Sequence, residues 1–236
     1  GMTLTVLCPS FGRPDAARAL YDSFHATARM KTELRFLVWE GDETRSKYPP
    51  NTFICPEEKM VARVNGALPP SEFVGWVADD NRFETKAWDY EVFSALRIRP
   101  GGVVYGDDVV SPGSKPSHVF MDARIPQALG WFLLPTLRST FFDDVWEQIG
   151  RGLGTLQYLP QIKVNHLYTE RDNYADFMAD KAEYERWVRH DFDDDLGRIR
   201  HALRKGRVHA GVRSQESGTI ERLRPGASPS DSGLSS

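Results

Sequence analysis

The sequence predicts an α/β fold in which helices flank a mostly parallel central sheet and a helical extension follows toward the C-terminus. Two observations favour this fold. Over the first 110 residues, short apolar runs typical of buried strands alternate with segments whose apolar residues recur at helical spacing. Strands that alternate with helices form βαβ units, in which the strands lie parallel. At 236 residues, the chain is long enough for one sizeable domain of this kind.

Turn residues and apolar periodicity delimit the elements of the first half. The expected strands are residues 4–7, 34–39, 52–54, 73–78 and 102–105, and the expected helices begin near Pro14, Lys59 and Thr85. Pro14 suits the first turn of a helix, because the N–H that proline lacks would have no intrahelical partner there. Thr85 can cap a helix whose apolar face carries Trp88, Val92 and Leu96.

The second half is less regular. A helix is expected from Asp143–Asp144 to Leu153, followed by short strands over 156–159 and 162–164 and then by His166. Apolar residues at helical spacing between 174 and 203 predict one or two further helices. We therefore expect one domain over residues 1–204, with halves of about 1–110 and 111–170 and a helical extension over about 172–204, and a flexible tail over 205–236.

The composition argues against several classes of protein. The net charge of −3 gives no electrostatic basis for binding nucleic acid. Only Cys8 and Cys55 are present, outside any CxxC pair, so neither a disulfide framework nor a cysteine-rich zinc site is expected. No run approaches the roughly 20 apolar residues that a membrane-spanning helix needs. We therefore expect a cytoplasmic protein without a transmembrane segment.

Acidic residues follow three of the predicted strands. Glu40 and Asp42 follow the second strand, Asp79–Asp80 the fourth and Asp107–Asp108 the fifth. In open α/β sheets, ligands bind at the carboxyl ends of the strands, so these acids predict a binding site at that edge. The alternative is a set of polar turns, since aspartate and asparagine are favoured in turns.

Asp79–Asp80–Asn81 is the strongest candidate for a cation site. The apolar run FVGWVA precedes these residues, so both carboxylates emerge directly from the buried sheet. Adjacent carboxylates repel each other unless a cation or solvent balances them, and hard divalent cations prefer oxygen ligands. His166 could add a nitrogen ligand, although a lone histidine after a strand is more often a surface or hydrogen-bonded residue.

Two further positions could take part in chemistry. Asp143 or Asp144 could act as a general base, the group that accepts a proton from a substrate hydroxyl. An aspartate at the start of a helix also caps it and interacts favourably with its dipole, and both roles can coexist. In the loop CPSFGRP, Arg13 could contact a phosphate, whereas a single arginine in a loop is usually solvated.

Taken in order, these segments resemble family-2-type GT-A glycosyltransferases. The matching segments are TVLCPSFGRPDAARAL, FLVWEGDE, KMVARVNGAL, FVGWVADDNRFETKAWD and FFDDVWEQIGRGLGTLQYLPQIKVNH, roughly residues 3–170. The resemblance implies a GT-A-type fold that transfers a sugar from a nucleotide-diphosphate donor to an acceptor hydroxyl, with inversion at the anomeric carbon. It implies Mn²⁺ or Mg²⁺ and, from family habit, a UDP-sugar. The acceptor, whether a glycan, a protein or a small molecule, stays open.

The resemblance also implies roles for individual residues. Contacts to the donor nucleotide fall on Pro9, Ser10, Arg13, Glu40 and Asp79, with Lys59 or Arg63 as a further contact. The metal ligand is implied at Asp80, with His166 as a second one. The general base is implied at Asp143 or Asp144, and the choice stays open because the usual family form is Glu–Asp.

Three alternative functions compete with this interpretation. A non-catalytic nucleotide-sugar or glycan-binding module could keep the same fold, but it would not hydrolyse the donor. A sugar-1-phosphate nucleotidyltransferase would carry a glycine-rich loop with Arg and Lys near the N-terminus, and CPSFGRP has too few glycines. A scaffold that uses its tail for partner contacts would be sensitive to deletion of the residues after 204, whereas an enzyme would keep its activity.

Overall fold

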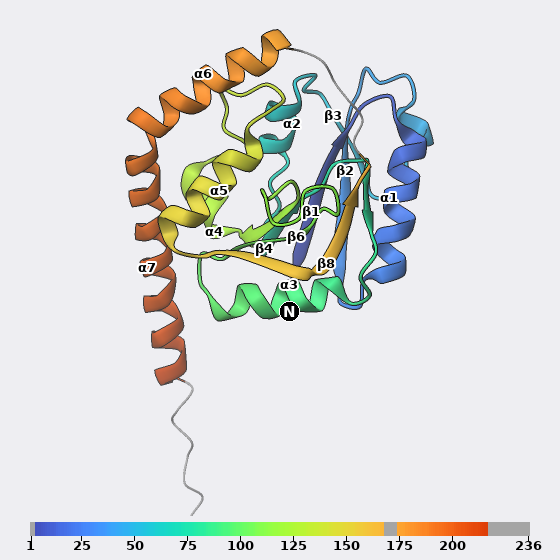
Figure 1. Ribbon diagram of the computed structural model, residues 1–236. Helices are drawn as coiled ribbons and strands as arrows, with labels where there is room; N and C mark the ends of the chain where they lie inside the picture. Colours follow the sequence, from blue (N-terminus) through green and yellow to red (C-terminus); the bar gives the residue numbers. More distant parts are fainter. Residues whose placement is uncertain (1–2, 168–173, 217–236) are drawn as a thin grey trace, which may run out of the picture. The chain divides into compact units, whose positions relative to one another are not determined.

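The computed structural model describes residues 3–167 and 174–216, the last eleven of these by their backbone (Figure 1). Residues 1–203 form one compact unit. The strands are β1 (Leu4–Ser10), β2 (Thr32–Trp39), β3 (Thr52–Cys55), β4 (Phe73–Trp76), β5 (Asn81–Phe83), β6 (Val103–Asp107), β7 (Val119–Asp122) and β8 (Leu156–His166). The helices are α1 (Pro14–Thr27), α2 (Met60–Gly66), α3 (Trp88–Ile98), α4 (Arg124–Leu129), α5 (Phe142–Leu153), α6 (Tyr174–His190) and α7 (Phe192–Glu216), with a short 3-10 helix at Arg45–Lys47.

The strands form one sheet in the order β3-β2-β1-β4-β7-β6-β8-β5. Strands β3, β2, β1 and β4 are parallel, and β6 is parallel to β8. Strand β7 is antiparallel to both of its neighbours, β4 and β6, so β6 and β8 run in the same direction as β4. The carboxyl ends of β1, β2, β4, β6 and β8 therefore share one edge, and the acidic residues after β2, β4 and β6 lie along it.

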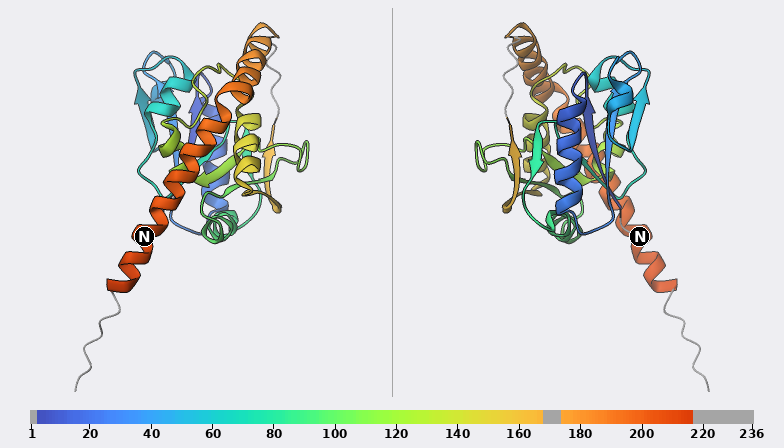
Figure 2. Two further views of the ribbon diagram at one scale, coloured as in Figure 1. Left: turned by 90° about the vertical axis from the view of Figure 1, so that its left-hand side faces the viewer. Right: turned by 90° about the vertical axis from the view of Figure 1, so that its right-hand side faces the viewer.

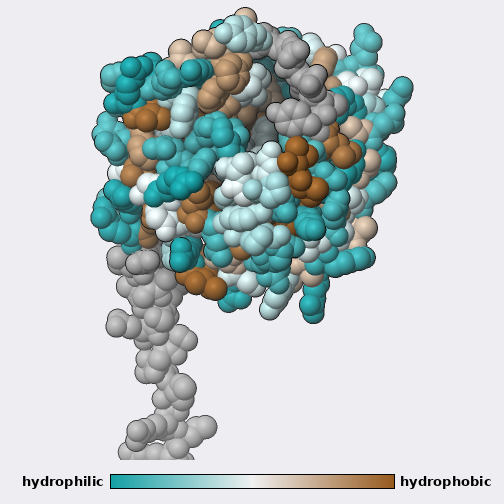
Figure 3. Space-filling model, in the orientation of Figure 1, coloured by the Kyte–Doolittle hydropathy of each residue, from teal (hydrophilic) through white to brown (hydrophobic). Residues whose placement is uncertain are grey.

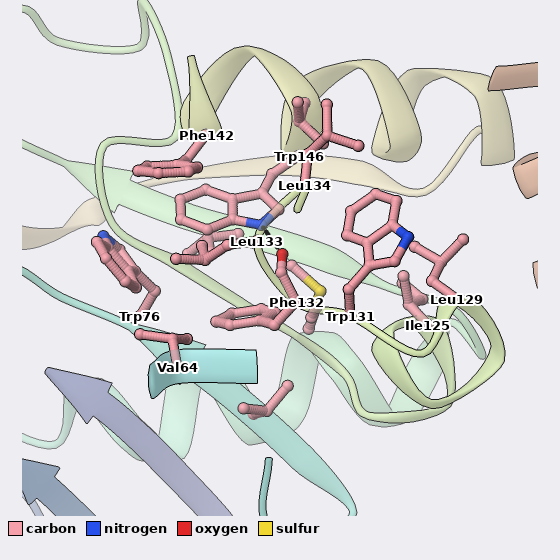
Figure 4. Packing of buried hydrophobic residues seen from close by; sticks show 14 of the residues in the cluster. Val64, Trp76, Ile125, Leu129, Trp131, Phe132, Leu133, Leu134, Phe142 and Trp146 are labelled. Atoms are coloured by element: carbon pink, nitrogen blue, oxygen red, sulfur yellow. Dashed lines mark hydrogen bonds between the residues drawn. The ribbon is translucent and has the colours of Figure 1, made fainter. Parts of the chain in front are cut away.

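A hydrophobic core lies on each face of the sheet, as the period-2 alternation of side chains along β1 and β2 requires. Leu4, Val6 and Cys8 pack with α1 and α3, whereas Leu7 packs on the opposite face. That second core contains an aromatic group made by Trp76, Phe132, Phe142 and Trp146 (Figure 4). The indole N–H of Trp146 donates to the carbonyl of Phe132 at 3.1 Å, so the polar atom of this buried ring is satisfied.

The helical extension belongs to the same compact unit. Trp187 of α6 and Ile199 of α7 are buried in the core that α5 lines. Asp180 of α6 is also fully buried, and its carboxylate accepts backbone hydrogen bonds from Arg138, Ser139 and Thr140, each at 2.9 Å. The two side views in Figure 2 place α1 on one side of the sheet and α6 on the other. Within the described residues, no helix combines the length and apolar composition needed to cross a bilayer.

Several expected elements differ in the structure. Strands β5 and β7 and helix α4 were not predicted, because each is short and depends on tertiary pairing rather than on its own periodicity. The two expected strands after residue 155 are one strand, β8, whose pairing with β6 shifts between Leu159 and Lys163. Pro160 lies inside that irregularity, where no ladder hydrogen bond is required of it.

Two expectations about helix ends were wrong. Thr85 does not cap α3, since its hydroxyl instead donates to the carbonyl of Gln161 and the cap position is Ala87. The tail expected over 205–236 begins as helix, because α7 continues to Glu216. Extending a formed helix adds one hydrogen bond per residue without a new nucleation cost, which offsets the glycines of this segment. The rest of that expected tail lies outside the described residues.

Candidate active site

Asp79 connects the end of β4 to the loop after β1. Its carboxylate accepts a hydrogen bond from Ser10 Oγ at 2.6 Å and lies 2.9 Å from the Arg13 guanidinium. The Asp79 side chain is 6% exposed, so the ion pair is shielded from solvent on the acid's side. Tyr48 completes the junction, with its hydroxyl 3.0 Å from Ser10 Oγ. Asp79 thus contacts two other residues expected near a donor nucleotide, Ser10 and Arg13.

Asp42, rather than Glu40, is the acid after β2 that is built into this edge. Its carboxylate accepts hydrogen bonds from the Gly12 and Thr44 backbone amides at 2.8 and 2.7 Å. Burial alone would raise the pKa of Asp42, but these bonds and those of the Thr44 and Tyr48 hydroxyls lower it below its ordinary value. Glu40 is exposed. A feature of the sequence distinguishes the two acids: Thr44 lies two residues after Asp42. An aspartate can close a local turn by accepting a hydrogen bond from the backbone two residues later, as Asp42 does from Thr44.

Asp80 and His166 lie face to face, with His166 Nε2 3.3 Å from Asp80 Oδ1. Antiparallel pairing of β5 with β8 sets Asn81 opposite His166, and the amide of Leu167 donates to the carbonyl of Asp80. The hydrogen bond to Asp80 raises the pKa of His166 against the opposing effect of burial, and the charges of Asp80, Asp108 and Asp143 raise it further. Asp80 and His166, which are 86 positions apart in the sequence, are thus brought together.

This pair does not form a metal site by itself. Across residues 3–167 and 174–216, no group of three or more His, Cys, Asp or Glu side chains is arranged to hold an ion. One carboxylate oxygen and one imidazole nitrogen remain a suitable pair for Mn²⁺ or Mg²⁺, because ligands in adjacent octahedral positions are about 3 Å apart. The other positions would then need ligand or water oxygens.

Asp143 and Asp144 occupy the first turn of α5 but have different surroundings. Burial and the negative charge of Asp144 raise the pKa of Asp143 to about 6, although the charge of Lys115 acts in the opposite direction. Asp144 is bound by Lys115, whose Nζ lies 2.6 Å from Asp144 Oδ1. Asp143 lies close enough to the Asp80–His166 pair for its charge to contribute to the raised pKa of His166.

Lys115 is a site residue that the sequence did not reveal. It lies in the loop between β6 and β7, among Pro112, Gly113 and Pro116, where a lysine is usually solvated. The loop is anchored at Gly113, whose carbonyl accepts a hydrogen bond from the Tyr105 hydroxyl. No local pattern connects residue 115 with residue 144, so only the fold could show this contact.

A pocket of about 360 Å³ opens beside Ser10 at the same edge of the sheet. Its lining consists of Pro9, Ser10, Phe11, Trp39, Glu58, Met60 and Arg63. The rings of Phe11 and Trp39 lie 6.2 Å apart, and Phe11 is largely exposed. A Cβ on Gly41 would lie 2.4 Å from the Trp39 ring, so glycine at this position allows the indole to fold over the turn.

Arg63 forms the polar floor of this pocket. It is 4% exposed, and its Nη1 donates to the carbonyls of Glu57 and Glu58. Its Nε finds no hydrogen-bond partner within the described part of the chain. A buried donor without a partner is costly, which suggests that a ligand supplies one. Lys59, the alternative to Arg63, is exposed at the start of α2 and is not part of the lining.

The sheet order, the helices on both faces and the acids at the carboxyl edge define the class of fold, which is that of the GT-A-type glycosyltransferases. Among solved structures, the chain is similar to the mannosyltransferase PcManGT from Pyrobaculum calidifontis in complex with GDP-Man and Mn²⁺. That match has a TM-score of 0.54 at 11% identity and covers 93% of this chain and 81% of that chain.

The chain is also similar to residues 1–349 of S. aureus TarS. The complex of TarS with UDP gives a TM-score of 0.52 at 13% identity, over 69% of this chain and 59% of that chain. The complex with UDP-GlcNAc gives 0.52 at 14% identity, over 75% and 61%. This chain therefore spans less than two thirds of that TarS fragment. No protein-family model and no curated protein matches the sequence. At these identities the comparisons establish the fold.

Proposed function

We propose that the protein is a metal-dependent glycosyltransferase that moves a sugar from a nucleotide-diphosphate donor to an acceptor hydroxyl with inversion of configuration. The observation that carries this proposal is the assembly of Asp80, His166 and Asp143 at the same sheet edge as an aromatic pocket. A cation-binding pair, a carboxyl group with a raised pKa and a pocket for a planar ring are the three parts that this reaction needs.

The pocket beside β1 fits the nucleoside of the donor. Phe11 and Trp39 offer aromatic faces to a base, and the Arg63 Nε can donate to a carbonyl or ring nitrogen of that base. Ser10, Arg13 and Asp79 are linked by hydrogen bonds and could hold the ribose and diphosphate. TarS binds UDP and UDP-GlcNAc, whereas PcManGT binds GDP-Man. A UDP-sugar remains our first expectation.

Asp80 and His166 would hold Mn²⁺ or Mg²⁺ together with the donor's phosphate oxygens. When bound, such an ion neutralises the charge that develops on the departing diphosphate. The protein's own contribution is to keep one carboxylate and one imidazole within 3.3 Å of each other in a mostly buried position. Because the donor's phosphate oxygens and water would fill the other coordination positions, Asp80 and His166 suffice as the protein's ligands to the ion.

We assign the general base to Asp143 rather than Asp144. In an inverting transfer, the base takes the proton of the acceptor hydroxyl while the oxygen attacks the anomeric carbon and the bond to the diphosphate breaks. A base works best when its pKa lies near the working pH, and the pKa of Asp143 is raised to about 6. Asp144 is bound to Lys115 and is therefore less able to accept that proton.

The test is a thermal-shift screen of UDP-, GDP- and dTDP-sugars with Mn²⁺ or with EDTA, followed by donor hydrolysis. A donor that binds the native state raises its melting temperature, and the increase should require Mn²⁺. Asp80→Asn should abolish the Mn²⁺-dependent increase and lower donor affinity at least about 10-fold. Asp15→Asn, the same change on the exposed face of α1, is the control. Equal metal dependence in both variants would refute the assignment.

The same screen separates the enzyme from a binding module. An enzyme hydrolyses its donor slowly when no acceptor is present, and the released nucleotide can be measured. A module that only binds nucleotide sugars gives the thermal shift without hydrolysis.

A further inference from the structure

We propose that the first turns of α6 form the acceptor subsite and that this subsite takes a pyranose ring. The ring stacks on Phe177, near Asp143 and Asp144, which are called the acid pair below. The inference rests on the proposed function and adds the chemical class of the acceptor. It starts from an aromatic row that no strand or pocket of the donor half uses, made by Phe177, Phe141, Tyr184 and Trp187.

The aromatic row runs from solvent into the core. Phe177 is 43% exposed, and its ring centroid lies 5.1 Å from that of Phe141. Phe141 in turn stacks on Tyr184, with 5.6 Å between the ring centroids and 21° between the ring planes. Tyr184 contacts the buried Trp187. The inner rings hold the outer one in place, so Phe177 offers a supported aromatic face to a ligand.

The row is tied to the acid pair through the backbone. Phe141 directly precedes α5 and has a φ of 65°, a left-handed conformation that non-glycine residues rarely adopt. The preceding residues 138–140 are fixed by the buried carboxylate of Asp180, which comes from α6 itself. Helix α6 and the first turn of α5 therefore form one rigid arrangement, and a ligand on Phe177 is held at a fixed position relative to Asp143.

Polar groups surround the aromatic face. Tyr184 stacks on Phe141, two residues before Asp143, so its ring lies near the acid pair. Burial raises the pKa of its hydroxyl, and the charge of Asp144 raises it further. Lys115, in the loop between β6 and β7, forms an ion pair with Asp144. On the outer side, Arg138 and Asp176 form an ion pair at 3.0 Å. Figure 3 shows more generally that hydrophilic residues predominate over one whole face of the molecule, with smaller hydrophobic patches among them.

This combination matches the chemistry of a sugar ring. A pyranose has an apolar face of C–H groups, which meets the negative face of an aromatic ring, and a rim of hydroxyls that need hydrogen-bonding partners. Carboxylates, a lysine and a phenol beside the ring supply those partners. A lipid chain would instead leave these charged groups desolvated without compensation.

The experiment measures transfer to a panel of p-nitrophenyl pyranosides, using the donor identified in the thermal-shift screen, in Phe177→Leu, Phe177→Tyr and wild type. Leucine keeps an apolar side chain suited to a helix but removes the ring, so KM for the accepted pyranoside should rise about 3- to 10-fold. Tyrosine restores the ring and should restore KM. Donor hydrolysis without an acceptor should be unchanged in all three proteins.

The matched control is Phe53→Leu. Phe53 is also 43% exposed, but it lies on β3 under Arg35, and its replacement should leave KM for the pyranoside unchanged. The inference is overturned if Phe177→Leu has the wild-type KM, or if a protein that hydrolyses its donor transfers sugar to no pyranoside in the panel. Absence of donor hydrolysis in wild type would instead count against the proposed function, so the two failures are distinguishable.

Discussion

Replacing Asp143 by asparagine should stabilise the folded protein at pH 8 and, in the same variant, strongly reduce the rate of sugar transfer. The pKa of Asp143 rises from 3.8 to about 6 on folding, chiefly because the side chain is buried and Asp144 is negative. Between these two values the folded protein keeps a proton that the unfolded chain has released, so stability falls as the pH rises through this window. Asparagine has no proton to release and avoids that loss.

The size of the gain follows from the same shift. A difference of about two pKa units corresponds to at most about 3 kcal/mol at pH 8, since each unit is worth about 1.4 kcal/mol. Against this, the negative charge in the first turn of α5 interacts with the helix dipole, a contribution of about 0.3–1 kcal/mol that the substitution removes. We therefore expect a net gain of about 1–2 kcal/mol at pH 8 and no gain near pH 4.

The assay is urea denaturation of Asp143→Asn and wild type at pH 4 and pH 8, together with transfer kinetics. Transfer should fall by about 10²–10⁴-fold, the usual contribution of a general base, while the donor-induced thermal shift persists. Asp144→Asn is the comparison: it loses its ion pair with Lys115 but also removes a charge that raises the pKa of Asp143, so its gain at pH 8 should be smaller than that of Asp143→Asn. If Asp143→Asn is less stable than wild type at pH 8, the raised pKa of Asp143 is contradicted. If the variant transfers sugar at the wild-type rate, Asp143 is not the base.

Two further predictions concern the groups around this acid. In Lys115→Met, the acidic limb of the kcat/KM profile should move to higher pH by about one unit, because the lysine's charge lowers the pKa of Asp143. Asp144→Asn should move the limb to lower pH, since Asp144 raises that pKa, and shifts of equal sign in the two variants would disprove the coupling. In Asp180→Ala, backbone amides of residues 138–140 lose their acceptor. Urea denaturation should then show a loss of at least about 2 kcal/mol, with a lower kcat; full activity would show that α6 does not position α5.

The sequence was sufficient for those parts of the site that depend on a strand end. Asp79 and Asp80 follow an apolar run, so their position at the carboxyl edge follows from the alternation of strands and helices. His166 was predicted from its place after a late strand, and the structure sets it 3.3 Å from Asp80. Such residues can be placed because chain direction and sheet topology are fixed by local periodicity and by the geometry of βαβ units.

The remaining parts depend on contacts between distant segments. Glu40 and Asp42 were equivalent in the sequence, and the hydrogen bonds to Gly12 and Thr44 distinguish them. Asp180 was one of many acids in an amphipathic helix, and its burial depends on the loop that it binds. The choice between Asp143 and Asp144 depends on a lysine in a loop between two strands, one of which the sequence did not reveal.

The reversed strand β7 has a consequence for how this protein could diversify. Because β6 ends at the edge of the candidate site and β7 starts there, the connection over residues 108–118 lies at that edge. Both of its ends are fixed by strand pairing, so insertions or deletions within it would leave the registry of the sheet intact. Evolution could thus remodel this connection, and with it the surroundings of Asp144, while the half of the domain that we propose to hold the donor stays unchanged.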